Sequence, residues 1–301
     1  MLTRAWSSAD YDVPLPEGHR FPARKYRMIR DAVVARGILG RQDVLAPEPC
    51  PRADLARVHT APYLDAMERG TLSEPDQRRL GFPWSAGLLE RSTRTVQATL
   101  EAARDALREG AGATLAGGTH HAFPDHGEGF CCFNDVAVAT RVLRASHSGL
   151  RTVVVDLDVH QGNGTAAIFA DDPDTYTFSM HGAKNFPFQK ERSSRDVELA
   201  DGTGDREYLA LLDRHIGEVL DEARADLVFY LAGSDPYAGD RFGRLRLSKE
   251  GLARRDRTVF TACRSRRLPV ILAMSGGYAP DLADIAEIHA TSVSELRSIC
   301  G

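Results

Sequence analysis

Cysteines are few in this sequence of 301 residues, and it has no long apolar run. The five cysteines are an odd number without C-x-x-C spacing, which indicates free thiols in a reducing compartment. No apolar run approaches the roughly 20 residues that span a membrane. Residues 1–20 contain no apolar core of signal-peptide length. We therefore expect a cytoplasmic protein with no membrane partner.

The sequence also lacks an excess of positive charge. The net charge is −4, and only four of the 38 basic residues are lysines, so no basic footprint for nucleic acid is present. No segment rich in proline, glycine or serine divides the chain, and no repeat is visible. We predict one catalytic domain over residues 1–301 with no nucleic-acid partner. The sequence does not indicate which oligomeric state the protein has.

Apolar periodicity predicts an α/β fold. Helical spacing predicts helices over 23–36, 54–69, 89–108, 134–146, 205–224 and 248–263. Short, nearly continuous apolar runs predict strands at 113–117, 152–158, 175–180, 226–233 and 269–277. Runs of this kind that alternate with helices are typical of a mainly parallel central sheet with helices on both faces.

Polar or glycine-rich segments follow the five predicted strands. These segments read GGTHHAF, DLDVHQGNG, SMHGAKNFPF, AGSDPYAGD and SGGYAPD. In parallel α/β sheets, ligands bind outside the carboxyl ends of the strands. We therefore expect the functional site at that edge of the sheet.

The segment VVVDLDVHQGNG carries Asp156, Asp158 and His160, which would share one face of a strand. Buried polar groups need partners, and a structural ion-pair cluster would supply them as well as a metal would. Asp158 and His160 with Asp235 offer one imidazole and two carboxylates, which suits a catalytic zinc ion with open positions. Taken alone, Asp235 in GSDPYAGD could instead be a helix N-cap.

Two adjacent histidines follow the first predicted strand. His120 and His121 suit the roles of general acid and general base near neutral pH. Asp156 would be free to orient His120 through a hydrogen bond. Tyr278, after the last strand, is a candidate donor to the oxyanion that forms when water attacks an amide.

Two aromatic residues have alternative interpretations. Phe130, which follows Gly129, and Phe186 in KNFPF are either ordinary core residues or the aromatic walls of a narrow channel. A channel of this kind would hold an extended alkyl chain.

The blocks GGTHHAF, GFCCFND, DLDVHQGNGT, GSDPYAGD and SGGY, in this order and spacing, resemble the histone deacetylase family. The resemblance extends from His59 to Tyr278. It implies the arginase-deacetylase fold, a single α/β domain with a mainly parallel sheet. It also implies zinc-dependent hydrolysis of the amide bond of acyl-lysine in a protein or peptide.

The resemblance implies roles for individual residues. Asp158, His160 and Asp235 would bind one zinc ion. His120 and His121 would form the catalytic dyad, and the phenol of Tyr278 would polarise the carbonyl. The tunnel would be lined by Gly129, Phe130 and Phe186. Asp156 matches the carboxylate behind His120, and His121 is expected to be the base. Asn163 stands where class I enzymes place a second aspartate, behind His121. That departure, with Gln161 and the short length, resembles the class IV branch and its bacterial relatives.

The resemblance further implies a bound potassium ion. Backbone carbonyls near Asp156, Asp158 and His160, with Ser179, match a monovalent-cation site of the family. This ion would be structural, in addition to one catalytic zinc.

Three alternatives remain. Acetylated polyamines or other small acylated amines would suit the same chemistry, although no dimer-forming insertion of the polyamine enzymes is visible. A ureohydrolase with two manganese ions would need carboxylates where the chain has Gly162 and Tyr237. A module that binds acyl-lysine without cleaving it would be favoured if a ligand or Tyr278 were replaced, and none is.

Overall fold

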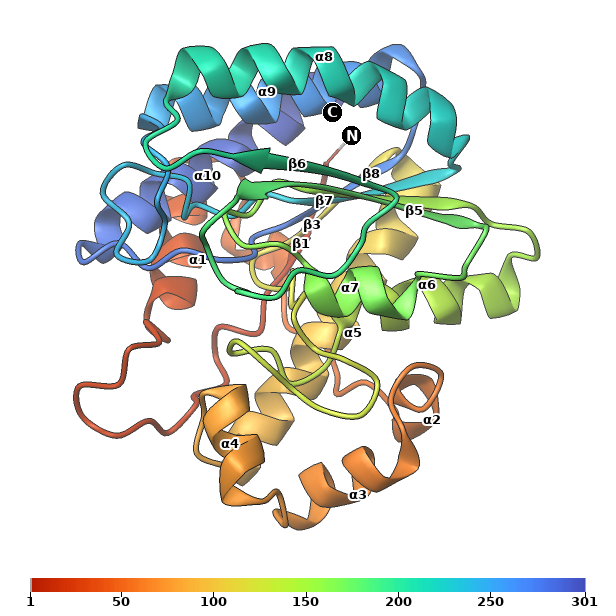
Figure 1. Cartoon of the computed structure of the whole chain (residues 1–301), viewed down its shortest axis with the longest axis vertical. Helices are drawn as coiled ribbons and strands as arrows, with labels where there is room; N and C mark the ends of the chain where they lie inside the picture. The colour runs from red at the N-terminus through yellow and green to blue at the C-terminus, as the bar shows by residue number, and fades with distance from the viewer. Residues whose placement is uncertain (1, 301) are drawn as a thin grey trace.

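The central feature of the computed structural model, which describes residues 2–300, is an eight-stranded sheet (Figure 1). The strands are β1 (Ala5–Trp6), β2 (Val44–Leu45), β3 (Ala111–Thr114), β4 (Thr152–Asp156), β5 (Thr175–Gly182), β6 (Arg195–Leu199), β7 (Leu227–Leu231) and β8 (Val270–Ala273). Their order is β2-β1-β3-β8-β7-β4-β5-β6, and all neighbouring strands are parallel. The prediction of a mainly parallel sheet is confirmed.

Helices cover both faces of this sheet (Figure 1). The helices are α1 (Lys25–Ala35), α2 (Arg52–Leu55), α3 (Ala61–Arg69), α4 (Glu74–Leu80), α5 (Ala86–Glu109), α6 (Asp135–Ser146), α7 (Asn163–Ile168), α8 (Asp205–Ala223), α9 (Lys249–Ser265) and α10 (Leu282–Cys300), with a 3-10 turn at Arg41–Asp43. Helices α1, α8, α9 and α10 cover one face, and α5 and α6 cover the other. No helix of the described residues is long and apolar enough to cross a membrane.

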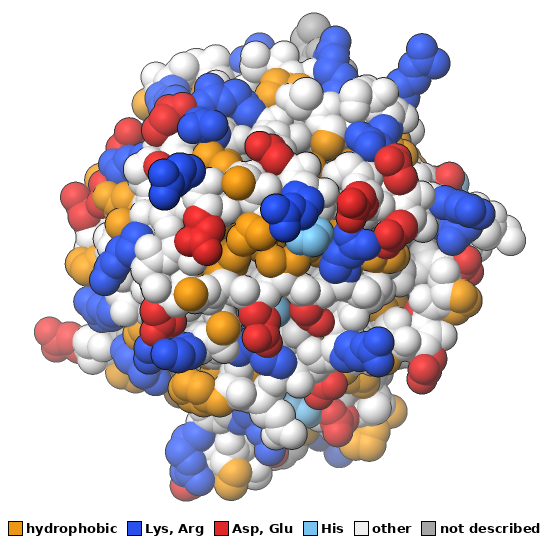
Figure 2. All heavy atoms as spheres, turned by 45° about the horizontal axis from the view of Figure 1, so that its top comes forward, with side chains coloured by type: hydrophobic (Ala, Val, Ile, Leu, Met, Phe, Trp, Pro, Cys, Tyr) orange, Lys and Arg blue, Asp and Glu red, His pale blue; other side chains and the backbone are white. Residues whose placement is uncertain are grey.

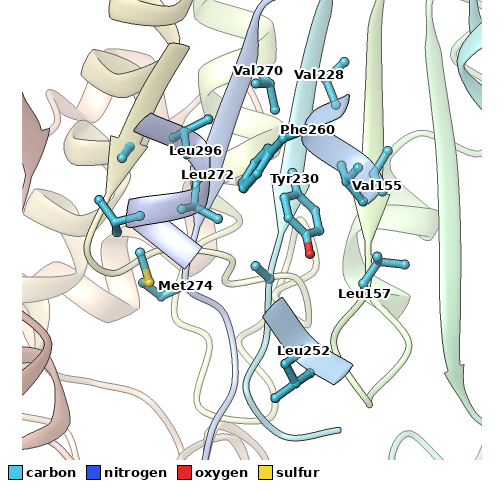
Figure 3. Close-up of a cluster of buried hydrophobic side chains, with 14 of the residues drawn as sticks. Val155, Leu157, Val228, Tyr230, Leu252, Phe260, Val270, Leu272, Met274 and Leu296 are labelled. Atoms are coloured by element: carbon cyan, nitrogen blue, oxygen red, sulfur yellow. The ribbon is translucent and has the colours of Figure 1, made fainter. Parts of the chain in front are cut away.

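Alternate side chains of the central strands supply the two cores. Val153 and Val155 of β4 pack toward α8 and α9, whereas Val154 between them packs toward α5 and α6. Figure 3 shows the first core, in which Tyr230 of β7 lies against Phe260 of α9, with ring centroids 5.4 Å apart. Each such buried side chain stabilises the fold by about 1.5–3 kcal/mol. Burial on both faces explains the continuous apolar runs of these strands.

One predicted helix is wrong. The segment 54–69 forms two helices, α2 and α3, separated by an irregular connection. Pro62 lies in the first turn of α3. A proline has no N–H and its ring clashes with the carbonyl four residues earlier, so it is accepted at a helix start but not in the interior of one long helix.

The predicted row of polar residues on one strand face is also wrong. Strand β4 ends at Asp156, and Asp158 and His160 lie in the irregular segment that follows. The Asp158 N–H donates to Asp156 Oδ1 at 3.1 Å, and the His160 N–H donates to Asp158 Oδ1 at 2.9 Å. These local side-chain to backbone hydrogen bonds replace the ladder and turn the chain out of the sheet.

Candidate functional site

One cavity of about 420 Å³ lies at the carboxyl edge of the sheet. It is lined by His121 after β3, His160 after β4, Phe186 after β5, Phe242 after β7 and Tyr278 after β8. Segments from all five predicted strands therefore meet at one site, as the parallel arrangement requires. The structure therefore brings the five predicted segments together at one cavity, which remains the candidate functional site.

Two carboxylates and an imidazole converge at this cavity. Asp158, His160 and Asp235 are buried, and one potential ligand atom of each lies within 4.8 Å of the others. Ser275 Oγ and the Gly276 N–H both donate to Asp158 Oδ2 at 2.7 Å. These bonds fix one oxygen of Asp158 and leave the other directed toward His160.

Asp235 fits a metal ligand and is not a helix N-cap, since no helix begins there. Its Oδ1 accepts from the Val159 N–H at 2.9 Å, whereas its buried Oδ2 has no well-aligned hydrogen bond from the described residues and lies 3.2 Å from Nδ1 of His160. Burial and the neighbouring Asp158 carboxylate raise the pKa of Asp235 to about 7. A cation would offset the cost of two adjacent buried carboxylates.

The donor set favours one metal ion. Among residues 2–300, Asp158, His160 and Asp235 form the one group of three or more His, Cys, Asp or Glu side chains close enough to hold a metal. One imidazole nitrogen and two carboxylate oxygens with open positions match catalytic zinc sites. The two-metal alternative lacks the additional ligands here.

His120 and His121 lie side by side next to this group, with ring centroids 4.1 Å apart. His120 Nδ1 lies 2.6 Å from Asp156 Oδ2, in the arrangement expected from the sequence. Burial lowers the pKa of His120, but the Asp156 and Asp158 carboxylates outweigh that effect and raise it to about 9. This environment favours a protonated His120.

His121 has the opposite environment. Its Nδ1 lies 2.7 Å from Asn163 Oδ1, and the Asn163 Nδ2 donates to Glu128 Oε2 at 2.9 Å. The Glu128 carboxylate accepts only, so it orients the amide with its oxygen toward His121, and Nδ1–H of His121 donates to that oxygen. Burial and the charge of His120 hold the pKa of His121 well below its usual range. His121 is therefore neutral, with Nε2 as the free acceptor.

The backbone of Tyr278 is fixed beside His160 and Phe130. Its N–H donates to Asp240 Oδ2 at 2.6 Å, and its ring lies against His160 and Phe130, with centroid distances of 6.4 and 5.9 Å. Burial and nearby carboxylates raise the pKa of Tyr278 well above its usual range. The phenol therefore remains a hydrogen-bond donor at physiological pH.

The three predicted channel residues line the same cavity. The Phe186 ring meets the His121 ring edge to face at 4.9 Å, and Phe130 lies on the side of Tyr278. Gly129 adopts a φ of +54°, and a Cβ there would lie 2.7 Å from Cδ2 of His121. The glycine therefore allows the channel wall to approach the histidine closely.

We expect Gly129→Ala to reduce kcat roughly tenfold to a hundredfold, because the added methyl group displaces the His121 ring and small misplacements of catalytic groups are costly. Gly149→Ala is a matched control, since Gly149 also has a positive φ of +79° but no atom within 4 Å of the added Cβ. In thermal unfolding, Gly129→Ala should lose more stability than Gly149→Ala, because the close contact with His121 adds to the backbone strain at positive φ that both variants share. Equal kcat in the two variants would show that the contact with His121 is unimportant.

Two buried aspartates support the site and were not assigned roles from the sequence. Asp135 accepts hydrogen bonds from the Gly118 and Thr119 N–H groups at 2.9 and 2.8 Å, and so fixes the segment that leads to the histidines. Asp240 fixes Tyr278 in the same way. Both residues end blocks that resemble the family, GFCCFND and GSDPYAGD, so their positions in these blocks were the available signal.

Comparisons with known proteins indicate the family of the chain. The model of the histone deacetylase domain matches residues 19–295. The chain is 45% identical over 280 residues to an uncharacterized protein of Picosynechococcus sp., covering 93% of each chain. It is 29% identical to histone deacetylase 2 of Arabidopsis thaliana, covering 96% of this chain and 77% of that protein. It is 28% identical to the histone deacetylase-like amidohydrolase of Pseudomonas aeruginosa, covering 88% of this chain and 74% of that protein.

Solved structures show the same fold. An HDAC homolog from Aquifex aeolicus superimposes with a TM-score of 0.82 at 21% identity, covering 98% of this chain and 84% of that chain. An HDAC homolog complexed with SAHA superimposes with a TM-score of 0.83 at 22% identity, with the same coverage. The chain therefore belongs to the histone deacetylase family, which has bacterial members.

Proposed function

We propose that this chain is a zinc-dependent amidohydrolase that removes acyl groups from lysine side chains. The observation that carries the proposal is the convergence of a three-residue metal site, an oriented histidine pair and a phenol on one cavity. Family membership supports deacetylase chemistry in general. The departure at Asn163 leads us to propose a class IV-like member, and the five free cysteines, which suit a reducing compartment, lead us to propose a cytoplasmic location.

Asp158, His160 and Asp235 would hold the single zinc ion. Bound there, zinc would polarise the amide carbonyl and lower the pKa of a water molecule toward 7. We also propose the structural potassium ion that the resemblance implies, near Asp156, Asp158, His160 and Ser179. Asp156 and Ser179 are neighbours in the register of β4 and β5.

His121 acts as the general base in this proposal. Its Nδ1 is held by Asn163, so Nε2 is free to accept a proton from the attacking water. The protonated ring then donates that proton to the leaving lysine amine, and the products are a carboxylate and a free amine. Gly129 and Phe186 keep the ring in position.

His120 and Tyr278 stabilise the negative charge that develops on the carbonyl oxygen. Asp156 holds His120 in its charged form, and the phenol of Tyr278 donates a hydrogen bond to the oxyanion. Phe130 and Phe186 flank the acyl-lysine stem in the channel. The non-catalytic binding module is not favoured, because no member of the machinery is replaced.

A mass-spectrometric competition assay tests this function. Zinc-loaded enzyme receives equimolar acetyl-, octanoyl- and myristoyl-lysine peptides together with acetylputrescine. Selective loss of an acyl-lysine peptide is expected and would identify the acyl group. Loss of acetylputrescine alone would instead assign the enzyme to small acylated amines, and no cleavage would favour the binding module.

We expect Asn163→Asp to shift the acidic limb of the kcat/KM profile to higher pH. An added carboxylate next to His121 stabilises the imidazolium and raises the pKa of His121, and the base works only when it is deprotonated. Comparing pH profiles of variant and wild type from pH 5 to 9 measures the shift. An unchanged acidic limb would show that another group is the base.

A further inference from the structure

A ring of basic side chains surrounds the mouth of the catalytic cavity. Five cationic residues line the cavity, all of them exposed, and no acidic residue lines it. This basic ring consists of Arg20, Arg78, Arg79, Lys184 and Arg244.

Nearby carboxylates neutralise only part of this charge. Arg78 pairs with Glu74 at 3.3 Å, whereas Arg20 and Arg79 have no carboxylate within 4 Å among residues 2–300. The guanidinium of Arg20 lies over the ring of Phe242, with Cζ 6.0 Å from the ring centroid. Two of the cations are therefore free to meet a charged ligand.

The remaining two cations share one acid. Arg244 and Lys184 both approach Asp201, at 3.0 and 4.0 Å. Glu74 and Asp201 together thus leave the five cations with a net positive charge. Charge of one sign around a cleft attracts ligands of the opposite sign and raises their association rate.

The basic ring is attached to the walls of the channel. The Arg79 carbonyl accepts from the Gly129 N–H at 3.3 Å, and the Leu80 carbonyl accepts from the Phe130 N–H at 2.8 Å. On the other wall, Asn185 Nδ2 donates to the Phe242 carbonyl at 2.8 Å. These bonds hold the charges at the entrance.

The five cations lie where the part of a bound substrate that stays outside the channel would be. His121 and His160, at the inner end, are 4% and 8% exposed, whereas the five cations are exposed. An acyl-lysine inserted toward the histidines would therefore leave its neighbouring residues against the basic ring. Phe188, 88% exposed, lines the same entrance.

We propose that the basic ring selects acyl-lysine peptides in which the residues flanking the lysine are acidic. The inference rests on the proposed function and specifies its substrate class. Acylated polyamines and peptides rich in lysine and arginine carry positive charge and would meet repulsion at the entrance. Figure 2, turned so that the top of Figure 1 with α8 and α9 comes forward, shows basic and acidic side chains interspersed over the visible surface.

The test uses three peptides with one acyl-lysine and two flanking residues on each side, all glutamate, all glutamine or all lysine. Hydrolysis by the zinc-loaded full chain gives kcat/KM, and fluorescence anisotropy with labelled peptides gives Kd. We expect the glutamate peptide to exceed the lysine peptide roughly tenfold in kcat/KM at about 20 mM salt, mainly through KM. The ratio should approach one at about 0.5 M salt, where charges are screened within a few ångströms.

A charge reversal locates the effect. Arg20→Glu with Arg79→Glu should abolish or invert the preference. Arg214→Glu with Arg254→Glu makes the same change in net charge on α8 and α9, at exposed residues that do not line the cavity, and should leave the preference unchanged. If one of these variants is unstable, the salt dependence of the wild type remains decisive.

The outcomes separate the two proposals. Equal Kd and kcat/KM for the three peptides at low salt would overturn the role of the basic ring while leaving the hydrolase intact. Tighter binding of the glutamate peptide without cleavage of any peptide would contradict the proposed function and retain the charge selection. If the control variant Arg214→Glu with Arg254→Glu also loses the preference for the glutamate peptide, the preference comes from the overall charge of the protein, and the role of the ring is overturned.

Discussion

Replacing Tyr278 by phenylalanine is expected to lower kcat by roughly 10²–10³-fold, which is the usual cost of losing one oxyanion donor. Tyr278 lines the cavity together with His121 and His160, and its raised pKa keeps the phenol protonated. Phenylalanine retains the ring contacts with Phe130 and the backbone bond to Asp240. The loss should therefore fall on kcat and leave KM nearly unchanged.

Tyr176→Phe is the matched control. The Tyr176 hydroxyl donates to Glu222 at the protein surface, so its removal deletes the same atom away from the cavity. Steady-state kinetics should give wild-type kcat for this control, and both variants should bind zinc like the wild type. Turnover of Tyr278→Phe within a factor of a few of wild type would remove the phenol from the mechanism.

Asp235→Asn is expected to lose zinc and, with it, activity. Changes to groups that only support metal ligands reduce affinity 10–100-fold, so loss of a ligand charge should reduce it by more than about 100-fold. The remaining oxygen can still accept from the Val159 N–H, which keeps the local backbone in place. Metal analysis of the purified variant and calorimetric titration with zinc measure the effect, with the exposed Asp171→Asn as control.

The same variant should be more stable than wild type when both are metal-free. The pKa of Asp235 is raised to about 7, so its ionisation costs folding stability as the pH rises from the usual carboxyl range toward neutrality. Asparagine removes that cost, and the metal-free variant should melt several degrees higher at pH 7.5. Zinc should then raise the Tm of the wild type alone. A lower Tm of the metal-free variant would mean that Asp235 is a structural ion-pair partner.

The sequence predicts the central strands and the position of the site well, because their signals are local. Buried parallel strands read as continuous apolar runs, and each run is followed by the segment that reaches the cavity. The predicted ligands, dyad, phenol and channel residues all lie at that cavity or directly behind it. Their roles remain predictions until they are tested.

Features that depend on tertiary contacts were missed. Strands β1 and β2 have two residues each, which is too short for a periodic signal, and β6 alternates charged and apolar residues at the sheet edge. Helices α4, α7 and α10 were also not predicted. The basic ring comes from four separate segments of the chain, so only the folded structure brings its charges together.

The most direct test of the account is a titration of metal-free enzyme with zinc, followed by release of the acyl group as a carboxylate from an acyl-lysine peptide. The account predicts that no acyl group is released without metal. The rate of release should rise linearly with added zinc and reach a plateau at one zinc per chain, whereas the rate of Asp235→Asn should not rise. A plateau at two metal ions per chain, or full activity without any metal, would contradict it.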